Sequence, residues 1–520
     1  MTPEIKPPSA PIILTPDVLK DNCRVLQIHP ADNAGILIGP AVDGLPSGHK
    51  VALRAIRAGE SVIKYGDPIG FASQDIAAGE WIHTHNLKTG LNNDHFLAAQ
   101  VQKAAAPAAG PGQAQDAAPE KRPAGTGFFN GYCRPDGQVG LRNEIWIIPT
   151  VGCVNKTVEH LARYGQAQIA AGIWPGIDGV YGFTHPYGCS QLGDDHVKTR
   201  QILADLARHP NAGAVLIVGL GCENNQIDGL KAEIGSSNPD RLAFFATQEV
   251  DDEEKTGQKL LGKLADYAGQ FTRQPCSVDK LIVGLKCGGS DAFSGLTANP
   301  LLGRFSDWLT AAGGSTLLTE VPEMFGAEHL LLRRAANPDV FQRLDGLFAD
   351  FRTYYTQHDL PVYENPSPGN KAGGITTLEE KSLGCTQKAG SSPIVDVIRY
   401  GSRIRKPGLT ILEGPGNDIV ASTALAAAGA QIILFTTGRG TPLGSPVPTL
   451  KIASNTILAG KKPHWIDLDA GQVLLSPAKR DETDQQLVDL VLSVASGEVR
   501  TRNETHDYRE IAIFKNGVTL

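Results

Sequence analysis

The sequence has little cysteine, no long hydrophobic run and no surplus of positive charge. Its 520 residues include only 8 cysteines, too few for a disulfide scaffold, so we expect free thiols, metal ligands or small buried side chains. No apolar run approaches the ~20 residues that a membrane helix needs. No apolar segment follows a basic start at the N-terminus, so no secretory signal is predicted. We therefore expect a cytoplasmic protein with no membrane partner.

The charge balance and the missing nucleotide motifs exclude further classes. Lys and Arg number 48 against 55 Asp and Glu, for a net charge of −7. A weakly acidic chain lacks the overall positive charge that attracts nucleic acid, so no nucleic-acid partner is predicted. The sequence also lacks a Walker A loop, and no GxGxxG enters a helix after the first strand. Neither ATP nor NAD is therefore expected.

The composition along the chain predicts several domains. At ~100–200 residues per domain, this length suggests three to four. Residues 101–127 are rich in Ala, Pro, Gly and Gln, which is typical of a flexible linker. In residues 1–100, Gly, Pro and Asp interrupt short apolar runs every ten residues or so. This spacing predicts a small all-β domain.

The longer part of the chain has the pattern of an α/β protein. Near-continuous apolar runs alternate with helix-like segments, as in a mostly parallel sheet covered on both faces. We expect a central α/β domain at 128–390 and a second α/β subdomain at 391–520. Ligands of such sheets bind at the carboxyl ends of the strands.

Four cysteines share one context in the sequence. Cys153, Cys189, Cys222 and Cys287 each follow a predicted strand and a short tip, so parallel strands would bring them to one end of a sheet. Thiolates suit iron, iron–sulfur clusters or zinc. The spacing is not CxxC, and small buried residues at tight turns are the alternative. Among the other cysteines, only Cys385 draws attention.

Two pairs of histidines are candidate ligands or bases. His185 and His196 flank one polar loop, where either could bind a metal or act as a base near neutral pH. His83 and His85 stand in HTHN at a predicted strand end. Residues i and i+2 of a strand face the same side, so both imidazoles could reach one ion. An exposed surface pair is the alternative; a ligand pair would make the small domain a lid for a site elsewhere.

Acidic and basic side chains near predicted strand ends and Gly-rich stretches are further candidate site residues. Glu320 and Glu323 follow a predicted strand and suit oxygen ligation, acid–base work or the first turn of a helix. Gly-rich stretches at 287–295, 365–374 and 436–444 would let backbone amides approach a ligand. Cations in or beside these stretches and the 385–392 loop could hold a substrate carboxylate, or be ordinary solvated charges: Lys286, Lys371, Lys388 and Arg439.

Taken together, the motifs resemble the altronate/galactarate dehydratase family. The likeness runs from the small domain to the last residues, and the small domain resembles a SAF (β-clip) domain. Of the motifs, HTHN and YGCSQLGDDH resemble the altronate branch. The resemblance is carried by GHKVAL (48–53), VIKYGDPIGFA (62–72), IHTHN (82–86), RPDGQVGLRNEIWIIPTVGCVN (134–155), YGCSQLGDDH (187–196), VGLGCENNQ (218–226), GLKCGGSDAFSG (284–295), NPSPGNKAGG (365–374) and TTGRGTP (436–442).

The resemblance implies a reaction and a cofactor. The expected reaction is dehydration of D-altronate to 2-dehydro-3-deoxy-D-gluconate, in galacturonate catabolism, with a small sugar acid as the only partner. Family members are iron(II)-dependent, and manganese serves some of them; an iron–sulfur cluster on the cysteines is the competing picture. The alternatives are galactarate or another sugar acid as substrate and, more distantly, a non-catalytic sugar-acid binding protein. Large metabolic enzymes are often symmetric, so a homo-oligomer is one expectation.

Under this resemblance we assign roles to the candidate residues as a hypothesis. The metal ligands would be His83, His85, Cys189, Cys222 and Cys287. The acid and base would come from His185, His196 and Lys286. Lys286, Lys371 and Arg439 would hold the substrate carboxylate, and its hydroxyls would meet Asn224, Ser290 and Asp291.

Overall fold

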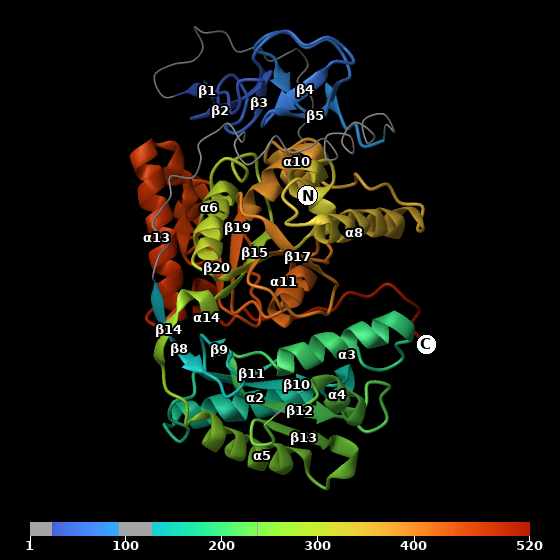
Figure 1. The fold of residues 1–520 in the computed structure, drawn as a ribbon, viewed down its shortest axis with the longest axis vertical. Coiled ribbons are helices and arrows are strands. Elements are labelled where there is room, and N and C mark those ends of the chain that lie inside the picture. Colours follow the sequence, from blue (N-terminus) through green and yellow to red (C-terminus); the bar gives the residue numbers. More distant parts are fainter. Residues whose placement is uncertain (1–22, 93–126, 237) are drawn as a thin grey trace.

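A computed structural model of the protein describes residues 23–92, 127–236 and 238–520. These residues form three parts stacked along the long axis of the molecule (Figure 1). We call them the small domain (23–92), the second domain (127–277) and the large domain (278–507), which lies in the middle. The linker expected at 101–127 lies outside the described residues, apart from residue 127. No helix of the described residues is long and apolar enough to cross a membrane.

The small domain contains only strands and turns, as expected. Two antiparallel sheets, ordered β1-β2-β3-β6 and β4-β5-β7, share a core that includes Ile36, Val62 and Ile69. Tyr65 and Gly66 both have positive φ and form the two-residue turn of the β4–β5 hairpin. The strands are β1 (Arg24–Leu26), β2 (Ala34–Ile38), β3 (Lys50–Ala52), β4 (Ser61–Lys64), β5 (Asp67–Ala72), β6 (Trp81–Ile82) and β7 (Leu87–Lys88).

The second domain has a parallel four-stranded sheet, ordered β11-β10-β12-β13, with helices on both faces (Figure 1). All eight residues of β12 are buried, as in a strand covered on both sides. A small antiparallel sheet, β14-β8-β9, leads toward the large domain. The elements are β8 (Phe128–Cys133), β9 (Val139–Gly140), β10 (Glu144–Pro149), η2 (Gly152–Val154), α2 (Asn155–Ala170), β11 (Gly179–Gly182), α3 (Gly193–Ala207), β12 (Ala212–Gly219), α4 (Ile227–Ile234), β13 (Leu242–Ala246), η3 (Thr247–Glu249), α5 (Glu253–Ala268) and β14 (Gln274–Ser277).

The large domain is built on a parallel seven-stranded sheet, ordered β17-β18-β16-β15-β19-β20-β21. The boundary expected at residue 390 falls inside this sheet, between β16 and β17. Apolar runs predict strands but not which strands pair, so the sequence pattern did not reveal the continuity. The strands are β15 (Ile282–Cys287), β16 (Ser315–Leu318), β17 (Ile394–Ile398), β18 (Gly408–Leu412), β19 (Ile432–Thr437), β20 (Thr449–Ala453) and β21 (Leu468–Asp469).

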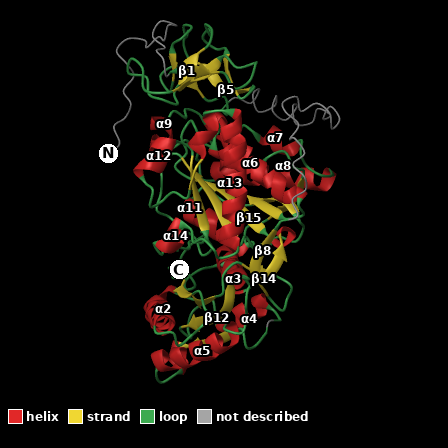
Figure 2. Cartoon of the chain, turned by 90° about the vertical axis from the view of Figure 1, so that its left-hand side faces the viewer, coloured by secondary structure: helices red, strands yellow, loops and turns green. Residues whose placement is uncertain are grey.

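Helices cover both faces of the large sheet (Figure 2). On one face α6 packs against the sheet and α13 packs on α6; on the other, α11 packs between the sheet and α3 of the second domain. One hydrophobic cluster therefore joins Leu206 of α3 to Leu425 of α11. The helices and 3-10 turns are η4 (Val278–Lys280), α6 (Ala298–Ala311), η5 (Val321–Met324), α7 (Glu328–Leu332), α8 (Pro338–Thr356), α9 (Pro368–Ala372), α10 (Leu378–Cys385), η6 (Thr386–Ala389), α11 (Asp418–Ala427), α12 (Thr456–Lys461), η7 (Ala470–Leu474), α13 (Pro477–Ala495) and α14 (Arg502–Thr505).

The last residues, 508–520, return to the second domain as a tail. The amides of Asn516 and Gly517 donate hydrogen bonds to the Asp195 carboxylate at the start of α3 (2.9 and 2.6 Å). The amide of Leu520 donates to the carbonyl of Ser190 (3.0 Å). The tail thus fixes the loop that precedes α3.

The architecture agrees with the expected fold class: a small all-β domain is followed by α/β domains with parallel sheets. What the sequence did not provide is the assignment of strands to the two parallel sheets.

Candidate metal centre and active site

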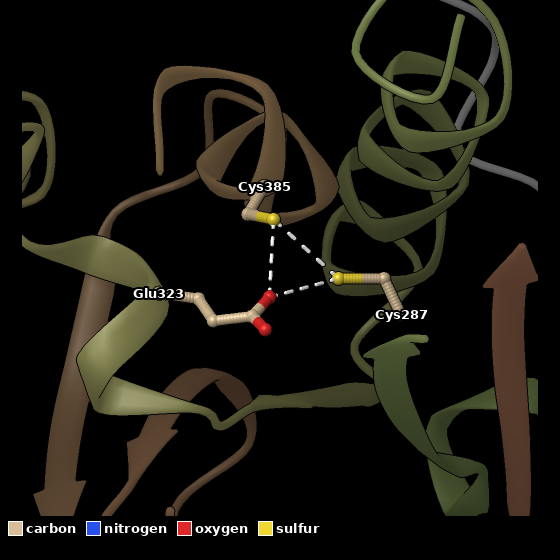
Figure 3. A group of neighbouring side chains, drawn as sticks. All are labelled: Cys287, Glu323 and Cys385. Atoms are coloured by element: carbon tan, nitrogen blue, oxygen red, sulfur yellow. Dashed lines mark hydrogen bonds between the residues drawn. The ribbon is translucent and has the colours of Figure 1, made fainter. Parts of the chain in front are cut away.

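Three buried side chains converge at the carboxyl edge of the seven-stranded sheet (Figure 3). Cys287 is the last residue of β15, Glu323 lies in η5 after β16, and Cys385 ends α10. Glu323 Oε2 is 3.3 Å from Cys287 Sγ and 3.2 Å from Cys385 Sγ, and the two sulfurs are 3.5 Å apart. Two soft sulfur donors and one carboxylate oxygen form a set that suits a transition metal ion such as iron or zinc.

Three buried lysines surround this group. Lys388 Nζ lies 2.7 Å from Cys287 Sγ, and Lys381 Nζ lies 2.8 Å from Glu323 Oε1. Lys286 Nζ lies 2.7 Å from an oxygen of Asp418, which begins α11. The centre thus combines metal-type donors with three buried ammonium groups.

The pKa shifts follow from burial and from these charges. Burial alone would raise the pKa of Glu323, but the ammonium groups of Lys381, Lys388 and Lys286 lower it to about 2. Burial would likewise lower the pKa of Lys286, but Asp418 and Glu320 raise it above its ordinary value. Glu323 therefore stays a carboxylate and Lys286 an ammonium at neutral pH.

Glu320 holds the lysines from the other side. Its carboxylate accepts hydrogen bonds from Lys286 Nζ and from the Cys287 amide (3.1 Å), and Lys388 Nζ lies 3.4 Å away. Its backbone is left-handed (φ 71°), which is uncommon for a residue with a side chain. Such strain at a buried charge cluster is typical of functional sites.

The small domain closes one side of the centre. A cavity beside Cys385 and Lys381 is also lined by Lys64 and Tyr65 of the β4–β5 hairpin. The Tyr65 ring fits only because position 295 is glycine: a methyl group there would collide with the Tyr65 hydroxyl. Burial raises the pKa of Tyr65, so its hydroxyl keeps its proton at neutral pH.

Two predicted substrate residues line the same cavity. Ser290 Oγ is buried and has no hydrogen-bond partner among the described residues, so it is available to a ligand. Asp291 is instead occupied: it accepts hydrogen bonds from Ser294 Oγ, Ser454 Oγ and Asn455 Nδ2 (2.9, 2.7 and 2.9 Å). Asp291 thus ties the Gly-rich stretch to the loop after β20.

The predicted histidine pair lies in the turn between β6 and β7. His83 is buried and donates from Nε2 to the carbonyl of Lys371 in α9 (3.0 Å). Burial, followed by the charge of Lys50, lowers the pKa of His83 to about 4. His85 is half-buried beside Trp81. The His83 side chain thus contacts the large domain at the backbone carbonyl of Lys371. The Lys371 side chain itself is half-buried.

The remaining cation, Arg439, lies after β19 and is exposed. Its amide donates to the carbonyl of Gly289 (3.0 Å), which joins two Gly-rich stretches. Its side chain runs past Gly369 at the start of α9. Arg439 is therefore at the rim of this edge of the sheet.

Other predicted residues lie in the second domain, on a different sheet from Cys287. His185 uses both ring nitrogens: Nε2 donates to the carbonyl of Pro149 (2.9 Å), and Nδ1 accepts from the Tyr187 amide (3.2 Å). Burial lowers its pKa to about 4. These contacts are those of a neutral histidine that holds a loop.

The rest of this group gathers at the carboxyl edge of the four-stranded sheet. His196 Nε2 accepts a hydrogen bond from Arg200 (2.9 Å), and burial, then Arg200, lowers its pKa. Asn224 Oδ1 accepts from the Ser190 amide (2.9 Å). Cys189 and Cys222 are both exposed. Their roles, like those of the histidine pair, stay predictions.

The centre also contains residues that the sequence assignment left out. Glu323, Cys385 and Lys388 stood among the candidates but not in the final assignment of roles, and Lys381 was missed. Lys381 and Cys385 are four residues apart on α10, so they share one helix face. That spacing was the available signal, but α10 could not be placed against β15 from sequence.

Comparison with known proteins agrees with this geometry. Three family descriptions match the chain: "Altronate/galactarate dehydratase SAF domain" at 23–90, "D-galactarate dehydratase/Altronate hydrolase, second domain" at 131–270 and "D-galactarate/Altronate dehydratase, C-terminal" at 278–519. The chain belongs to the altronate/galactarate dehydratase family. The matched segments coincide with the three domains of the structure.

Several curated members of this dehydratase family are similar over nearly their whole length. The altronate dehydratase of Bacillus subtilis (strain 168) is 51% identical over 92% of this chain and 93% of its own. That of Escherichia coli (strain K12) is 48% identical over 96% and 100%. The galactarate dehydratase (L-threo-forming) of Escherichia coli (strain K12) is 33% identical over 94% and 96%. The protein is thus an enzyme of a hydro-lyase family, and its Cys–Glu–Cys group fits a metal-dependent dehydratase.

Proposed function

We propose that the protein dehydrates D-altronate to 2-dehydro-3-deoxy-D-gluconate, with iron(II) held by Cys287, Glu323 and Cys385. The observation that carries the proposal is the buried Cys–Glu–Cys group ringed by lysines at the carboxyl edge of the large sheet. The higher identity to altronate than to galactarate dehydratases supports altronate as the substrate. Manganese is the substitute that the family resemblance implies, but it prefers oxygen donors, so the two sulfurs of this group favour iron.

The chemistry explains why both metal donors and lysines are needed. In the reaction, a base takes the weakly acidic proton from C2, next to a carboxylate, and the C3 hydroxyl takes a proton from an acid and leaves as water. A bound metal ion supplies a Lewis acid that polarises substrate oxygens. The ammonium groups of Lys286, Lys381 and Lys388 would neutralise the substrate carboxylate and the charge that develops as C2 loses its proton.

We assign the proton donor for the departing hydroxyl to Tyr65. Its hydroxyl enters the cavity lined by Ser290, Lys381 and Cys385, and its raised pKa keeps the proton available. Ser290 would bind a substrate hydroxyl, because its own oxygen is buried without a partner among the described residues. Lys286 stays protonated, so it would act as a fixed charge rather than as the base.

The small domain would exclude water from this cavity. Lys50 and Lys64 of the small domain both bind Glu380 of α10 (2.8 Å each), so the hairpin that carries Tyr65 is fixed against the helix that carries Cys385. A water-excluded site strengthens each of these electrostatic contacts.

An anaerobic assay with metal analysis tests the proposal. Enzyme stripped by a chelator should be inactive on D-altronate and should recover with ferrous iron, with galactarate turned over far more slowly. Cys287→Ser and Cys385→Ser should lose both iron and activity. Cys276→Ser, which changes a buried cysteine in β14 of another sheet, is the matched control and should keep both.

Two outcomes would contradict the proposal. Full iron content and activity in both centre variants would exclude the Cys–Glu–Cys group as the metal site. A preference for galactarate in the iron-loaded wild type would retain the centre but assign the wrong acid.

Two further expectations remain proposals. We propose a homo-oligomer, because closed symmetry is common among enzymes of this size, and mass measurement in solution tests it. We propose the cytoplasm as the location, supported by pairs of free thiols such as Cys133 and Cys276, whose sulfurs are 3.4 Å apart. Cell fractionation tests this second proposal.

A further inference from the structure

The second domain carries three exposed cysteines at one edge of its sheet. Cys153 follows β10, Cys189 follows β11 and Cys222 follows β12, and all three are exposed. In the sheet, β10 lies between β11 and β12, and neighbouring strands are ~4.8 Å apart, so the three strand ends span about 10 Å. Free cysteine is one of the most buried residue types. Three exposed thiols in the loops that follow adjacent strands therefore need an explanation.

The three loops that carry these cysteines are joined to one another. The Asn225 side chain, from the Cys222 loop, donates to the carbonyl of Thr150 near Cys153 (3.1 Å). The Asn225 amide also donates to the carbonyl of Gly188 in the Cys189 loop (3.0 Å). The Gly152 amide, next to Cys153, donates to the carbonyl of Tyr187 in the same loop (2.9 Å). The relative positions of the cysteine backbones are thus fixed by the fold.

The Cys189 loop is held in an unusual conformation. Gly188 has φ 99°, and a side chain there would collide with the carbonyl of Thr150. Ser190 has φ 59° despite its side chain, and the tail holds it through the amide of Leu520 (3.0 Å). Backbone strain of this kind is typical of sites whose geometry matters.

Nothing in the packing requires the thiols themselves. Cys189 Sγ has only Ser190 Oγ at 3.8 Å, and Cys222 Sγ only the Gln248 side chain at 3.6 Å, as described hydrogen-bond contacts. Each cysteine lies a few residues before a helix: Cys153 before α2, Cys189 before α3 and Cys222 before α4. Helix N-termini favour negative charge, so they suit thiolate ligands.

The sulfurs of Cys153, Cys189 and Cys222 do not form a group within 4.8 Å, which argues against a single ion as their ligand. The ligand atoms of the Cys287 centre lie within 4.8 Å of one another, and no other such group of three exists in residues 23–92, 127–236 and 238–520. As arranged, the three exposed sulfurs would not enclose a single ion. In an iron–sulfur cluster, each thiolate binds a different iron, so its ligands stand farther apart.

We propose that Cys153, Cys189 and Cys222 bind an iron–sulfur cluster. This site is on the second domain and shares no residue with the Cys287 centre, so it does not depend on the proposed function. Under this proposal, Cys287 and Cys385 bind the single metal ion, and Cys153, Cys189 and Cys222 bind the cluster.

Anaerobic reconstitution of the full chain tests the proposal. After incubation with ferrous iron and sulfide and removal of the excess, acid-labile sulfide should remain in proportion to the extra iron. Reduction should give a cluster signal in electron paramagnetic resonance. Cys153→Ser, Cys189→Ser and Cys222→Ser should each lose most of the sulfide, and the triple variant all of it.

The controls separate this site from the other thiols. Cys133→Ser removes an exposed cysteine of β8, and it should keep the full sulfide content. Cys385→Ser should keep the sulfide while losing the single iron of the other centre. Circular dichroism should show that the triple variant is folded.

Three results would overturn the proposal. They are reconstituted wild type without sulfide, a triple variant with as much sulfide as wild type, and a metal bound to the three cysteines without sulfide. None of these readouts measures dehydration, so a failure of the proposed reaction would not be mistaken for a failure of the cluster.

Discussion

Ser290 and Ser382 both have buried hydroxyls without a hydrogen-bond partner among the described residues. Only Ser290 lines the cavity beside Cys385, whereas Ser382 is enclosed in α10. An unsatisfied buried hydroxyl costs free energy, so one that faces the cavity is better explained by a ligand than by packing. This contrast gives a matched pair of variants.

We expect Ser290→Ala to lower kcat/KM for D-altronate by about 10-fold, which corresponds to one lost hydrogen bond of ~1.4 kcal/mol. Thermal stability should change little, because no partner in the described protein is lost. Ser382→Ala should change neither quantity. Equal kinetic effects of the two variants would show that Ser290 does not contact substrate.

Tyr65 provides a second prediction at this scale. Tyr65→Phe should reduce kcat by ~10²–10⁴-fold, the range for a positioned acid or base, and should leave the iron content unchanged. Because the pKa of Tyr65 is raised, the loss should be the same across neutral pH. Tyr181→Phe, at another half-buried tyrosine with a raised pKa in the second domain, is the control. Unchanged kcat in Tyr65→Phe would remove the hydroxyl from the mechanism.

Sequence reasoning identified part of the centre and could not have completed it. Cys287 was assigned because it follows a predicted strand, and Lys286 because it lies beside a Gly-rich stretch; both lie at the end of β15. Cys287 was grouped with Cys189 and Cys222 because all follow strands in the same way. Separating them requires the strand order of two sheets, which depends on pairing between strands as far apart in the sequence as β15 and β19.

At the scale of elements, α10 connects the domains. All its residues are buried, and it presents Glu380 to the small domain while Lys381 and Cys385 face the centre. Hydrophobic periodicity would not reveal such a helix, because half of its buried positions are polar. Its charged side chains, Glu379, Glu380 and Lys381, are bonded by residues of other elements.

The ion pairs of Glu380 should be important for stability. Glu380→Gln leaves the buried ammonium groups of Lys50 and Lys64 without their carboxylate, so we expect a loss of ~3–5 kcal/mol. Denaturant unfolding measures it. Glu379→Gln is the control, because the neighbouring Glu379 is bound by the Thr89 hydroxyl and the Gly90 amide (2.9 and 2.6 Å), and it should cost clearly less. Equal losses would mean that the lysine pairs add nothing.

At the scale of the whole molecule, the same carboxylate predicts an acid response. Burial alone would raise the pKa of Glu380, but Lys50 and Lys64 hold it well below its usual range. The native state therefore binds fewer protons than the unfolded state at acid pH, so this stability is present above the ordinary carboxyl pKa of ~4.5 and is lost below it. The stability difference between wild type and Glu380→Gln should shrink as the pH falls from 5 to 3. A difference that stays constant over this interval would contradict the assigned pKa direction.

The whole-molecule architecture was predicted in kind but not in its divisions. Short punctuated strands identified the small domain, and buried runs such as β12 identified the parallel sheets. The boundary placed at residue 390 divides β15 and β16 from the strands beside them in the same sheet. The local hydrophobic pattern determines whether a segment forms a helix or a strand, whereas pairing between distant strands determines which sheet it joins.

The tail imposes an order of events during synthesis. Asp195 is translated 321 residues before Asn516, whose amide donates a hydrogen bond to it. Ser190 is likewise translated long before Leu520, whose amide donates to its carbonyl. While the ribosome is still upstream of these positions, the second domain can fold its sheet, but its Cys189 loop lacks the hydrogen bonds that the tail supplies. The contacts of the tail with that edge therefore form only after residues 516–520 have been translated.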